Sequence, residues 1–481
     1  MKIAVVGASG FIGRALINHL LTHSTHEIIA ISRSKLAFDS PRFEWRACDL
    51  HNLLQLEHTL QGAETAVYLI HSMLPGARLN QGSFSDFDLS LADNFGRTAR
   101  LHGIQRVIYL SGLIPDHKGH TLSDHLKSRL EVEDVLRSYV PRVTCLRAGM
   151  IIGPQGSSFT IVVRLVERLH LMICPRWTLH KSQAVYLDDV THIIASCIDA
   201  IQTDRRTIDI GAEPAMSYKE MLQKTAQLLG KKTLFISLPM LSIQLSKLWV
   251  RIVSGAPKDL VYPLVESLRE PMLVRPSHRW QEAGWAFTPF ETAVRKVVLQ
   301  MQALKAKGHL PHAFRVWKLK EKSVRSIQRL KLPPGRDAAW VAEQYVDYLP
   351  KIFPLLVRVV RDGSLIYLKM RGLPINLLIL DHSTERSSPD RQLFYVRGGL
   401  LSGGTNAKAR LELRETLGGT LCLAAVHDFT PRLPWILYRL TQAVIHAWFM
   451  ARLGTYIQRP LLAPLDEPAA ENRALPPASK R

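Results

Sequence analysis

A glycine-rich loop near the N-terminus constrains the fold of this 481-residue chain more than any other feature. The apolar run KIAVVGA, from Lys2, leads into GASGFIG, whose glycines are Gly7, Gly10 and Gly13. Helical spacing of apolar residues follows from Phe11 to His23. The first glycine permits a tight turn, and the third lets the helix pack closely on the strand. A strand, a glycine turn and a helix in this order predict the start of a doubly wound α/β fold.

Further strand-like runs alternate with amphipathic segments over the first 155 residues. They begin at Glu27, Phe43, Thr65, Arg106 and Val143. These runs are mostly apolar on both faces, which is typical of parallel strands covered by helices on both sides. Helical patterns dominate from 157 to 298, which we expect to form a small substrate region at the carboxyl edge of the sheet. We therefore predict a parallel Rossmann sheet for residues 1–300.

The glycine loop also predicts a ligand. In this context the second glycine lets the backbone approach a pyrophosphate, and the helix N-terminus favours its negative charge. We expect the loop residues Gly7, Ser9, Gly10, Phe11, Ile12 and Gly13 to bind a dinucleotide. A turn with a purely structural role, in a fold that has lost its cofactor, is the alternative.

The end of the second strand favours NADP(H) over NAD(H). A carboxylate usually takes the ribose 2′-hydroxyl of NAD at this position. Here the chain reads Ile31-Ser32-Arg33-Ser34-Lys35 and has no acid. Arg33 can bind a 2′-phosphate through two hydrogen bonds, which a carboxylate would repel. The alternative is that Arg33 is an ordinary surface residue.

With these features, the first 300 residues resemble the extended and atypical short-chain dehydrogenase/reductases, including epimerase/dehydratase-like and NmrA-like proteins. The matching segments are GASGFIG, Arg33, Asp49-Leu50, VYLIHSM from Val67, Asn94, YLSGL from Tyr109 and LRAGMIIGPQGS from Leu146. PRW at Pro175 and DDV at Asp188 are similar to bacterial members related to the NAD(P)-binding accessory subunit of respiratory complex I. The resemblance implies that Asp49 and Leu50 contact the adenine, and that the fourth strand, with Ile70 and His71 at its end, lies along the cofactor.

The family's reductases use a serine and a Tyr-x-x-x-Lys pair, and this chain departs from that pattern. Ser111 ends its strand in the expected place, but His125 stands at the tyrosine position and Arg129 at the lysine position. Arg129 can hydrogen-bond a ribose but, as a permanent cation, cannot relay a proton. His125, with an ordinary pKa of about 6.5, can donate a proton to a carbonyl. Two interpretations stay open: a reductase with a histidine acid, and a binding fold without redox turnover, in which His125 and His71 only make hydrogen bonds.

The C-terminal part has a different pattern. Residues 301–335 are strongly basic and predict either a solvated linker, at 301–322, with a first edge strand, or an electrostatic patch for lipid or nucleic acid. An amphipathic helix at 337–353 precedes strand pairs, with hairpin turns at Asp362-Gly363 and Gly418-Gly419. A long helix is expected from Trp435 to about Arg459. It is either the core helix of this domain or a basic amphipathic helix on an anionic membrane.

Residues 323–459 resemble the helix-grip fold of the START and polyketide-cyclase (SRPBCC) superfamily. The segments ERSSPDRQLFYVRGGLL, from Glu385, and HDFTPRLPWILYRLTQ, from His427, belong to this stretch. The resemblance implies an α+β antiparallel sheet around the final helix and an apolar small molecule in a pocket between them. The Pro- and Ala-rich tail at 460–481 is expected to be disordered.

The net charge and the motifs indicate which classes of ligand and partner this chain can bind. Lys and Arg number 62 and Asp and Glu 41, a net charge of +21 that favours anionic ligands. No DNA- or RNA-binding motif supports a specific nucleic acid, and no histidine or cysteine spacing predicts a metal site. The absence of a signal peptide pattern and of an apolar run long enough for a span predicts a cytoplasmic protein. The leading hypothesis is an NADP(H)-dependent oxidoreductase acting on an apolar carbonyl or quinone-like substrate, and the alternative is a catalytically silent nucleotide sensor or assembly factor.

Overall fold

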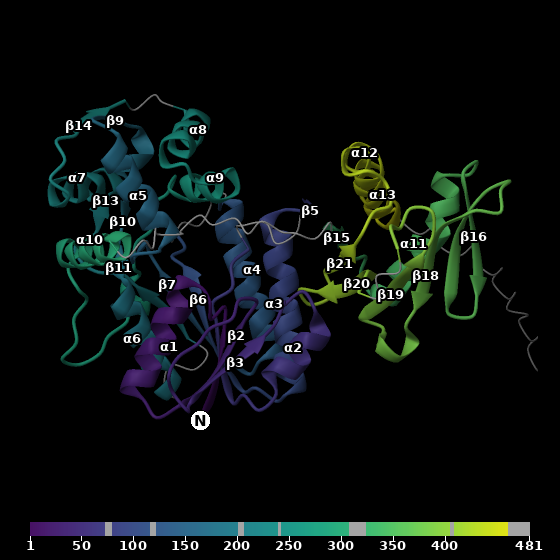
Figure 1. The fold of residues 1–481 in the computed structure, drawn as a ribbon, viewed down its shortest axis with the longest axis horizontal. Helices are drawn as coiled ribbons and strands as arrows, with labels where there is room; N and C mark the ends of the chain where they lie inside the picture. Colours follow the sequence, from purple (N-terminus) through teal and green to yellow (C-terminus); the bar gives the residue numbers. More distant parts are fainter. Residues whose placement is uncertain are drawn as a thin grey trace, which may run out of the picture.

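Two β-sheets, each covered by helices, organise the chain (Figure 1). The computed structural model describes residues 1–72, 79–115, 122–200, 206–238, 242–306, 324–404 and 408–459. The first sheet and its helices come from the N-terminal half, and nearly all of the second sheet comes from residues after 323.

The first sheet has seven strands in the order β12-β7-β6-β4-β1-β2-β3, and neighbouring strands are parallel throughout. The strands are β1 (Lys2–Val6), β2 (Glu27–Ser32), β3 (Phe43–Ala47), β4 (Thr65–Tyr68), β6 (Arg106–Gly112), β7 (Arg142–Ala148) and β12 (Thr207–Ile210). This order, with strands added outward on both sides of β1, is the doubly wound arrangement. The predicted parallel α/β sheet is confirmed.

Helices cover both faces of this sheet because alternate strand residues point to opposite sides. Ile3 and Val5 of β1 pack against one helix pair, and Ala4 and Val6 pack against the opposite layer. The pair is α1 (Phe11–His23) and α6 (Leu187–Asp199). The opposite layer is α2 (Leu53–Leu60), α3 (Phe84–Leu101) and α4 (Asp124–Tyr139).

A smaller, mainly helical region stands beyond the carboxyl edge of the sheet (Figure 1). Its helices are α5 (Ser157–Arg168), α7 (Tyr218–Leu228), α8 (Ile243–Ser254), α9 (Lys258–Ser267) and α10 (Phe290–Ala306). Its short strands are β8 (Ile151–Ile152), β9 (Leu171–Cys174), β10 (Lys181–Ser182), β11 (Val185–Tyr186), β13 (Met216–Ser217) and β14 (Leu234–Ser237).

The second sheet has the order β16-β17-β18-β19-β20-β21-β15-β5. Its strands are β16 (Val357–Asp362), β17 (Leu365–Met370), β18 (Asn376–His382), β19 (Arg391–Gly398), β20 (Arg410–Thr416), β21 (Leu421–Phe429), β15 (Val324–Lys331) and β5 (Leu79–Gln81). Seven of them are antiparallel, and both predicted hairpin turns are present. The eighth, β5, belongs to the N-terminal half and pairs with β15 in parallel.

Both faces of the second sheet are buried near β15, β20 and β21. On one face, Ile327, Leu423 and Ala425 join the core formed with α2, α3 and α4. On the other face, Leu330, Leu413 and Ala424 pack against α11 (Ala338–Ile352) and α13 (Gln442–Ile457). The helices of the first domain therefore form a shared layer between the two sheets.

Three expectations for the C-terminal part need correction. The single long helix is wrong, because the chain breaks at Thr441 (φ −123°, ψ −82°) into α12 (Trp435–Leu440) and α13. The strand β15 is not an edge strand, because β5 covers it. Its Arg329 is neither solvated nor part of an open patch, since it donates to Glu131 at 2.7 and 2.9 Å.

The rest of the basic linker and the C-terminal tail lie outside the described residues. The domain boundaries at 1–300 and 323–459 stay predictions.

A partly buried histidine on α13 predicts an acid-sensitive fold. Burial lowers the pKa of His446 to about 4, and no described residue hydrogen-bonds its Nε2. The unfolded chain takes up this proton near pH 6.5 and the folded chain only near pH 4, so stability is lost as pH falls between these values. Between pH 7 and 5 we expect His446 to cost about 2 kcal/mol of unfolding free energy. Urea titrations should show that this fall in pH costs the wild type about 2 kcal/mol more than it costs His446→Gln, since the other histidines with lowered pKa values are present in both proteins. Parallel pH profiles of the two proteins would contradict this.

Candidate functional site

A cavity of about 640 Å³ opens at the carboxyl edge of the first sheet, between the glycine loop and the helical region. Its wall contains every residue that the sequence singled out for the cofactor or for catalysis. The first group is Gly7, Ser9, Gly10, Phe11, Ile12, Gly13, Arg33, Asp49, Leu50, Ile70 and His71, and the second is Ser111, His125 and Arg129. The fold thus brings together residues from five separate strand ends and two helices.

The glycine loop leaves backbone exposed to this cavity. Gly7 has φ +94°, and a Cβ there would lie 3.2–3.3 Å from Ile70 and Leu69. A Cβ on Gly13 would lie 2.6 Å from the carbonyl oxygen of Gly7, so only glycine lets α1 approach β1 this closely. Gly10 is the N-cap of α1, and no side chain caps that helix end. The first amides of α1 are therefore open to an anionic group, as a pyrophosphate requires.

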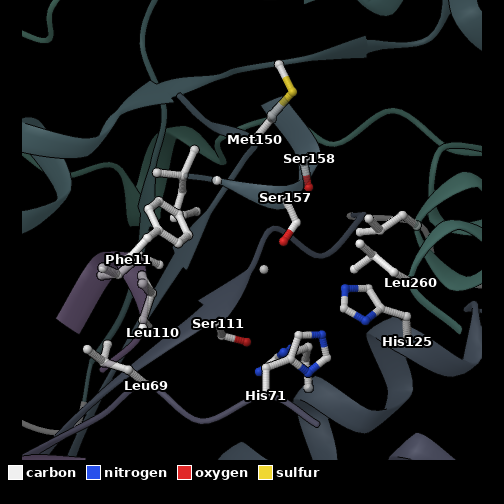
Figure 2. A pocket seen from close by; sticks show the side chains of 18 of the residues that line it. Phe11, Leu69, His71, Leu110, Ser111, His125, Met150, Ser157, Ser158 and Leu260 are labelled. Carbon is white, nitrogen blue, oxygen red and sulfur yellow. The ribbon is translucent and has the colours of Figure 1, made fainter. Parts of the chain in front are cut away.

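The far end of the cavity is apolar. Helices α5, α8 and α9 contribute side chains such as Ile161, Val250, Leu260 and Leu264. Phe11, Leu69 and Leu110 form the wall on the side of the sheet (Figure 2). An apolar chamber that adjoins a cofactor-type loop is the usual form of a small-molecule site.

Three polar groups lie between the loop and the apolar chamber. Figure 2 shows Ser111 near the ring of His71, with His125 beside it on α4. The two imidazole rings are 5.1 Å apart, centre to centre. Ser111 Oγ, His71 Nε2 and His125 Nδ1 are buried, and none has a hydrogen-bond partner among the described residues. Buried polar atoms without partners are costly, so this corner is suited to a ligand that supplies hydrogen bonds.

Asp88 on α3 holds His71 in place, and the sequence reasoning missed it. His71 Nδ1 donates to Asp88 Oδ2 at 2.9 Å, and the Ser72 amide donates to Oδ1 at 2.6 Å. Burial alone would raise the pKa of Asp88, but His71 and Arg129 together lower it to about 2. An available signal was that Asp88 lies on the same helical stripe as Phe84, Leu91 and Phe95, where a carboxylate needs a partner.

Both cavity histidines favour the neutral form. Burial, followed by the charge of Arg129, lowers the pKa of His71, while Asp88 opposes this shift. Burial lowers the pKa of His125 well below its usual value, and His71 and Arg129 add to that effect. The expectation that His125 titrates at about 6.5 is wrong, because the ring is desolvated and lies near a permanent cation.

Arg129 is engaged within the protein. Its guanidinium is buried and donates to the hydroxyl of Tyr109 on β6 at 2.9 Å. The charge of Arg129 faces Asp88 and both cavity histidines, so it sets their electrostatic environment. Its role toward a ribose stays a prediction.

The second domain contacts the loop that follows β3. Arg325 of β15 pairs with the carboxylate of Asp49, and Arg410 of β20 donates to the carbonyl oxygen of His51 at 2.6 Å. Arg414 of β20 donates to Asn94, whose amide in turn donates to the carbonyl oxygen of Leu50 at 2.7 Å. Burial would raise the pKa of Asp49, but Arg325 and His51 lower it well below its usual range. Sequence reasoning assigned Asp49 and Leu50 to the adenine but missed that the second domain holds them.

Comparison with known proteins agrees with this geometry. A model of the NAD(P)H-binding family matches residues 7–177. The auxiliary protein GraX of Staphylococcus aureus is 30% identical over 113 residues, which is 23% of this chain and 36% of that protein. The chain therefore spans about a third of the length of this curated relative.

Two solved structures of low sequence identity are similar to the N-terminal part of the chain. Triphenylmethane reductase of Citrobacter sp. superimposes with a TM-score of 0.50 and 17% identity, covering 62% of this chain and all of that one. The NADPH-dependent quinone oxidoreductase QOR2 of Escherichia coli gives a TM-score of 0.48 at 18% identity, over 62% of this chain and 99% of that one. The glycine loop, the sheet order and the match to the family model together make residues 7–177 of this chain similar to the NAD(P)H-binding domains of that family.

Proposed function

We propose that this protein binds NADP(H) in the N-terminal cavity and reduces an apolar carbonyl or quinone-like substrate there. The observation that carries the proposal is the meeting of three features in one cavity: the uncapped glycine loop, an apolar chamber and a corner of unpartnered polar atoms. Triphenylmethane reductase and QOR2 are named for reductase and quinone oxidoreductase activities, which is consistent with this substrate class.

The residues present fit the dinucleotide. The loop from Gly7 to Gly13 would hold the pyrophosphate against the amides of α1. Arg33 is exposed at the end of β2 on the cavity wall, where it would hold the 2′-phosphate. Asp49 and Leu50 would lie beside the adenine. The nicotinamide, when bound, supplies the hydride.

The chain's own residues would handle the substrate oxygen. Ser111 Oγ and the imidazole of His125 can donate hydrogen bonds to it, because they have no competing described partner at Oγ and Nδ1. His71 would deliver the proton from Nε2 while its Nδ1 stays hydrogen-bonded to Asp88, which stabilises the charged imidazolium before transfer. The apolar walls exclude water and strengthen these interactions.

Arg33 should determine the preference between the two cofactors. Arg33→Ala is expected to cost about 1–3 kcal/mol of NADPH binding, as for a lost charged hydrogen bond, and little NADH binding. Isothermal titration with both cofactors measures this. Gly10→Val is the matched loss-of-site control and should abolish both, since its side chain would occupy the space of the pyrophosphate. If Arg33→Ala weakened the binding of NADPH and NADH equally, Arg33 would not be the residue that binds the 2′-phosphate.

Single-turnover oxidation of bound NADPH tests the proposed reaction. The full chain is mixed with NADPH and a panel of benzoquinones, naphthoquinones and apolar ketones, and loss of absorbance at the reduced nicotinamide band is followed. We expect the bound NADPH to be oxidised only when an acceptor is present. The same acceptors should displace an apolar dye that binds in the cavity. Tight NADPH binding with no oxidation by any acceptor would instead support the silent sensor or assembly factor, which the missing Tyr-x-x-x-Lys pair favours.

We propose that the second domain has a helix-grip fold. The order of its elements supports this, since α11 and α13 pack against an antiparallel sheet. The space between them is filled by a cluster of buried side chains that includes Tyr345, Phe394, Phe449 and Leu453. We therefore place the apolar substrate in the N-terminal cavity rather than between this sheet and its helices.

A further inference from the structure

Helices α12 and α13 carry an exposed apolar surface. In Figure 1 both helices (yellow) stand at the top of the second domain, at the surface of the molecule. Their outward side chains, which we call the α12–α13 face, are Ile436, Leu437, Leu440, Val444, Ile445 and Trp448. Five of them are more than half exposed, and the most exposed are Ile436 at 73%, Leu440 at 64% and Val444 at 56%. Contiguous apolar exposure of this kind marks an interaction site.

The surface continues onto a second segment of the chain. The ring of Phe353 lies 5.9 Å from the ring of Trp448. The loop that follows Phe353 exposes Leu355 at 90% and Leu356 at 48%. Residues from two distant segments therefore widen the α12–α13 face beyond the helices themselves.

Positive charge surrounds this face. Arg432, Arg439 and Arg452 are exposed on or beside the two helices, and the guanidinium of Arg452 lies 5.7 Å from the centre of the Trp448 ring. The sequence from Thr430 to Arg459 contains no aspartate or glutamate. An apolar centre with only cationic flanks complements a surface that is negatively charged outside and apolar beneath.

We propose that the α12–α13 face docks the protein on an anionic lipid surface, with both helices lying in the plane of the interface. Within the described ranges, no helix is long and apolar enough to cross a membrane. The charge pattern selects an anionic bilayer over a second copy of this chain, because two such faces would bring their arginines together. Apolar side chains would enter the acyl boundary while the arginines pair with headgroups.

Vesicle flotation of the full chain tests the proposal. We expect the protein to float with vesicles of phosphatidylcholine and phosphatidylglycerol at 7:3, and not with phosphatidylcholine alone. Leu440→Asp should weaken binding by about tenfold or more, because it places a charge where an apolar side chain enters the lipid. Leu299→Asp on α10 is the matched control: Leu299 is 66% exposed, on a different surface, and its replacement should leave flotation unchanged.

The arginines have a separate signature. Arg439→Gln should weaken binding to anionic vesicles by about fivefold and make it less sensitive to salt, as expected for one basic residue near a charged surface. Unchanged flotation of Leu440→Asp would overturn the proposal, as would equal binding to neutral and anionic vesicles. Gel filtration with light scattering tests self-association. If the wild type did not float but formed a dimer, and Leu440→Asp dissociated that dimer, the α12–α13 face would be a dimer interface instead.

Discussion

Replacing Arg414 with methionine is expected to lower the free energy of unfolding by about 3–5 kcal/mol, the usual cost of breaking a buried ion pair. Arg414 of β20 is fully buried and lies 3.2 Å from Asp93 of α3, which is also fully buried. It also donates to Ser90 Oγ at 2.8 Å. Methionine fills much of the volume but leaves Ser90 without this donor and removes one of the two arginines beside Asp93, which keeps Arg97 at 3.0 Å, in a place that water does not reach.

Urea denaturation, followed by circular dichroism, measures the loss. Arg397→Met is the matched control: Arg397 pairs with Asp381 on the same sheet, but about half of its side chain is exposed. Exposed pairs contribute about 0–1 kcal/mol, so the control should unfold almost as the wild type does. Because Arg414 also supports Leu50 through Asn94, its variant should bind NADPH more weakly even under folding conditions. Similar unfolding curves for the two variants would mean that the domain interface does not depend on this pair.

Replacing either cavity histidine should abolish most turnover while leaving cofactor binding intact. We expect His71→Ala and His125→Ala each to lower kcat by about 10²–10⁴-fold, the range for loss of a general acid or a hydrogen bond to the reacting oxygen. The Kd for NADPH should change little, because neither side chain lies at the pyrophosphate or 2′-phosphate position. His58→Ala, on the exposed side of α2, is the control and should retain full activity.

The pH dependence separates a proton donor from a structural histidine. The pKa values of both rings are lowered, so the charged form is scarce at neutral pH and increases as pH falls. The wild type should therefore show kcat/KM rising from pH 8 toward pH 6, and Asp88→Asn should lower kcat because it removes the carboxylate that stabilises the imidazolium. A flat profile, with kcat unaffected by Asp88→Asn, would exclude His71 as the proton source.

Features that depend on residues close together in the chain were predictable from the sequence. The turn at Gly7 and the close packing at Gly13 follow from missing side chains within a seven-residue motif, so strand, turn and helix were predictable together. The hairpins at Asp362-Gly363 and Gly418-Gly419 were equally local, because glycines at positive φ close them. The parallel sheet followed from strands that are apolar on both faces. The positions lining the cavity could be identified because carboxyl ends of parallel strands meet at one edge.

The way in which the two halves pack together was not predictable from local sequence patterns. The pairing of β5 with β15 joins segments more than 240 residues apart in the chain, and three backbone positions of β5 give no local signal strong enough to predict it. Arg325, Arg329 and Arg414 were visible as charges, but the sequence does not say which acid each one meets. Their acidic partners lie on the loop after β3 and on α3 and α4. These ion pairs are buried only because the two domains pack together and exclude water from the interface. Likewise, Asp88 reaches His71 only because α3 packs beside the end of β4, a contact set by the whole fold.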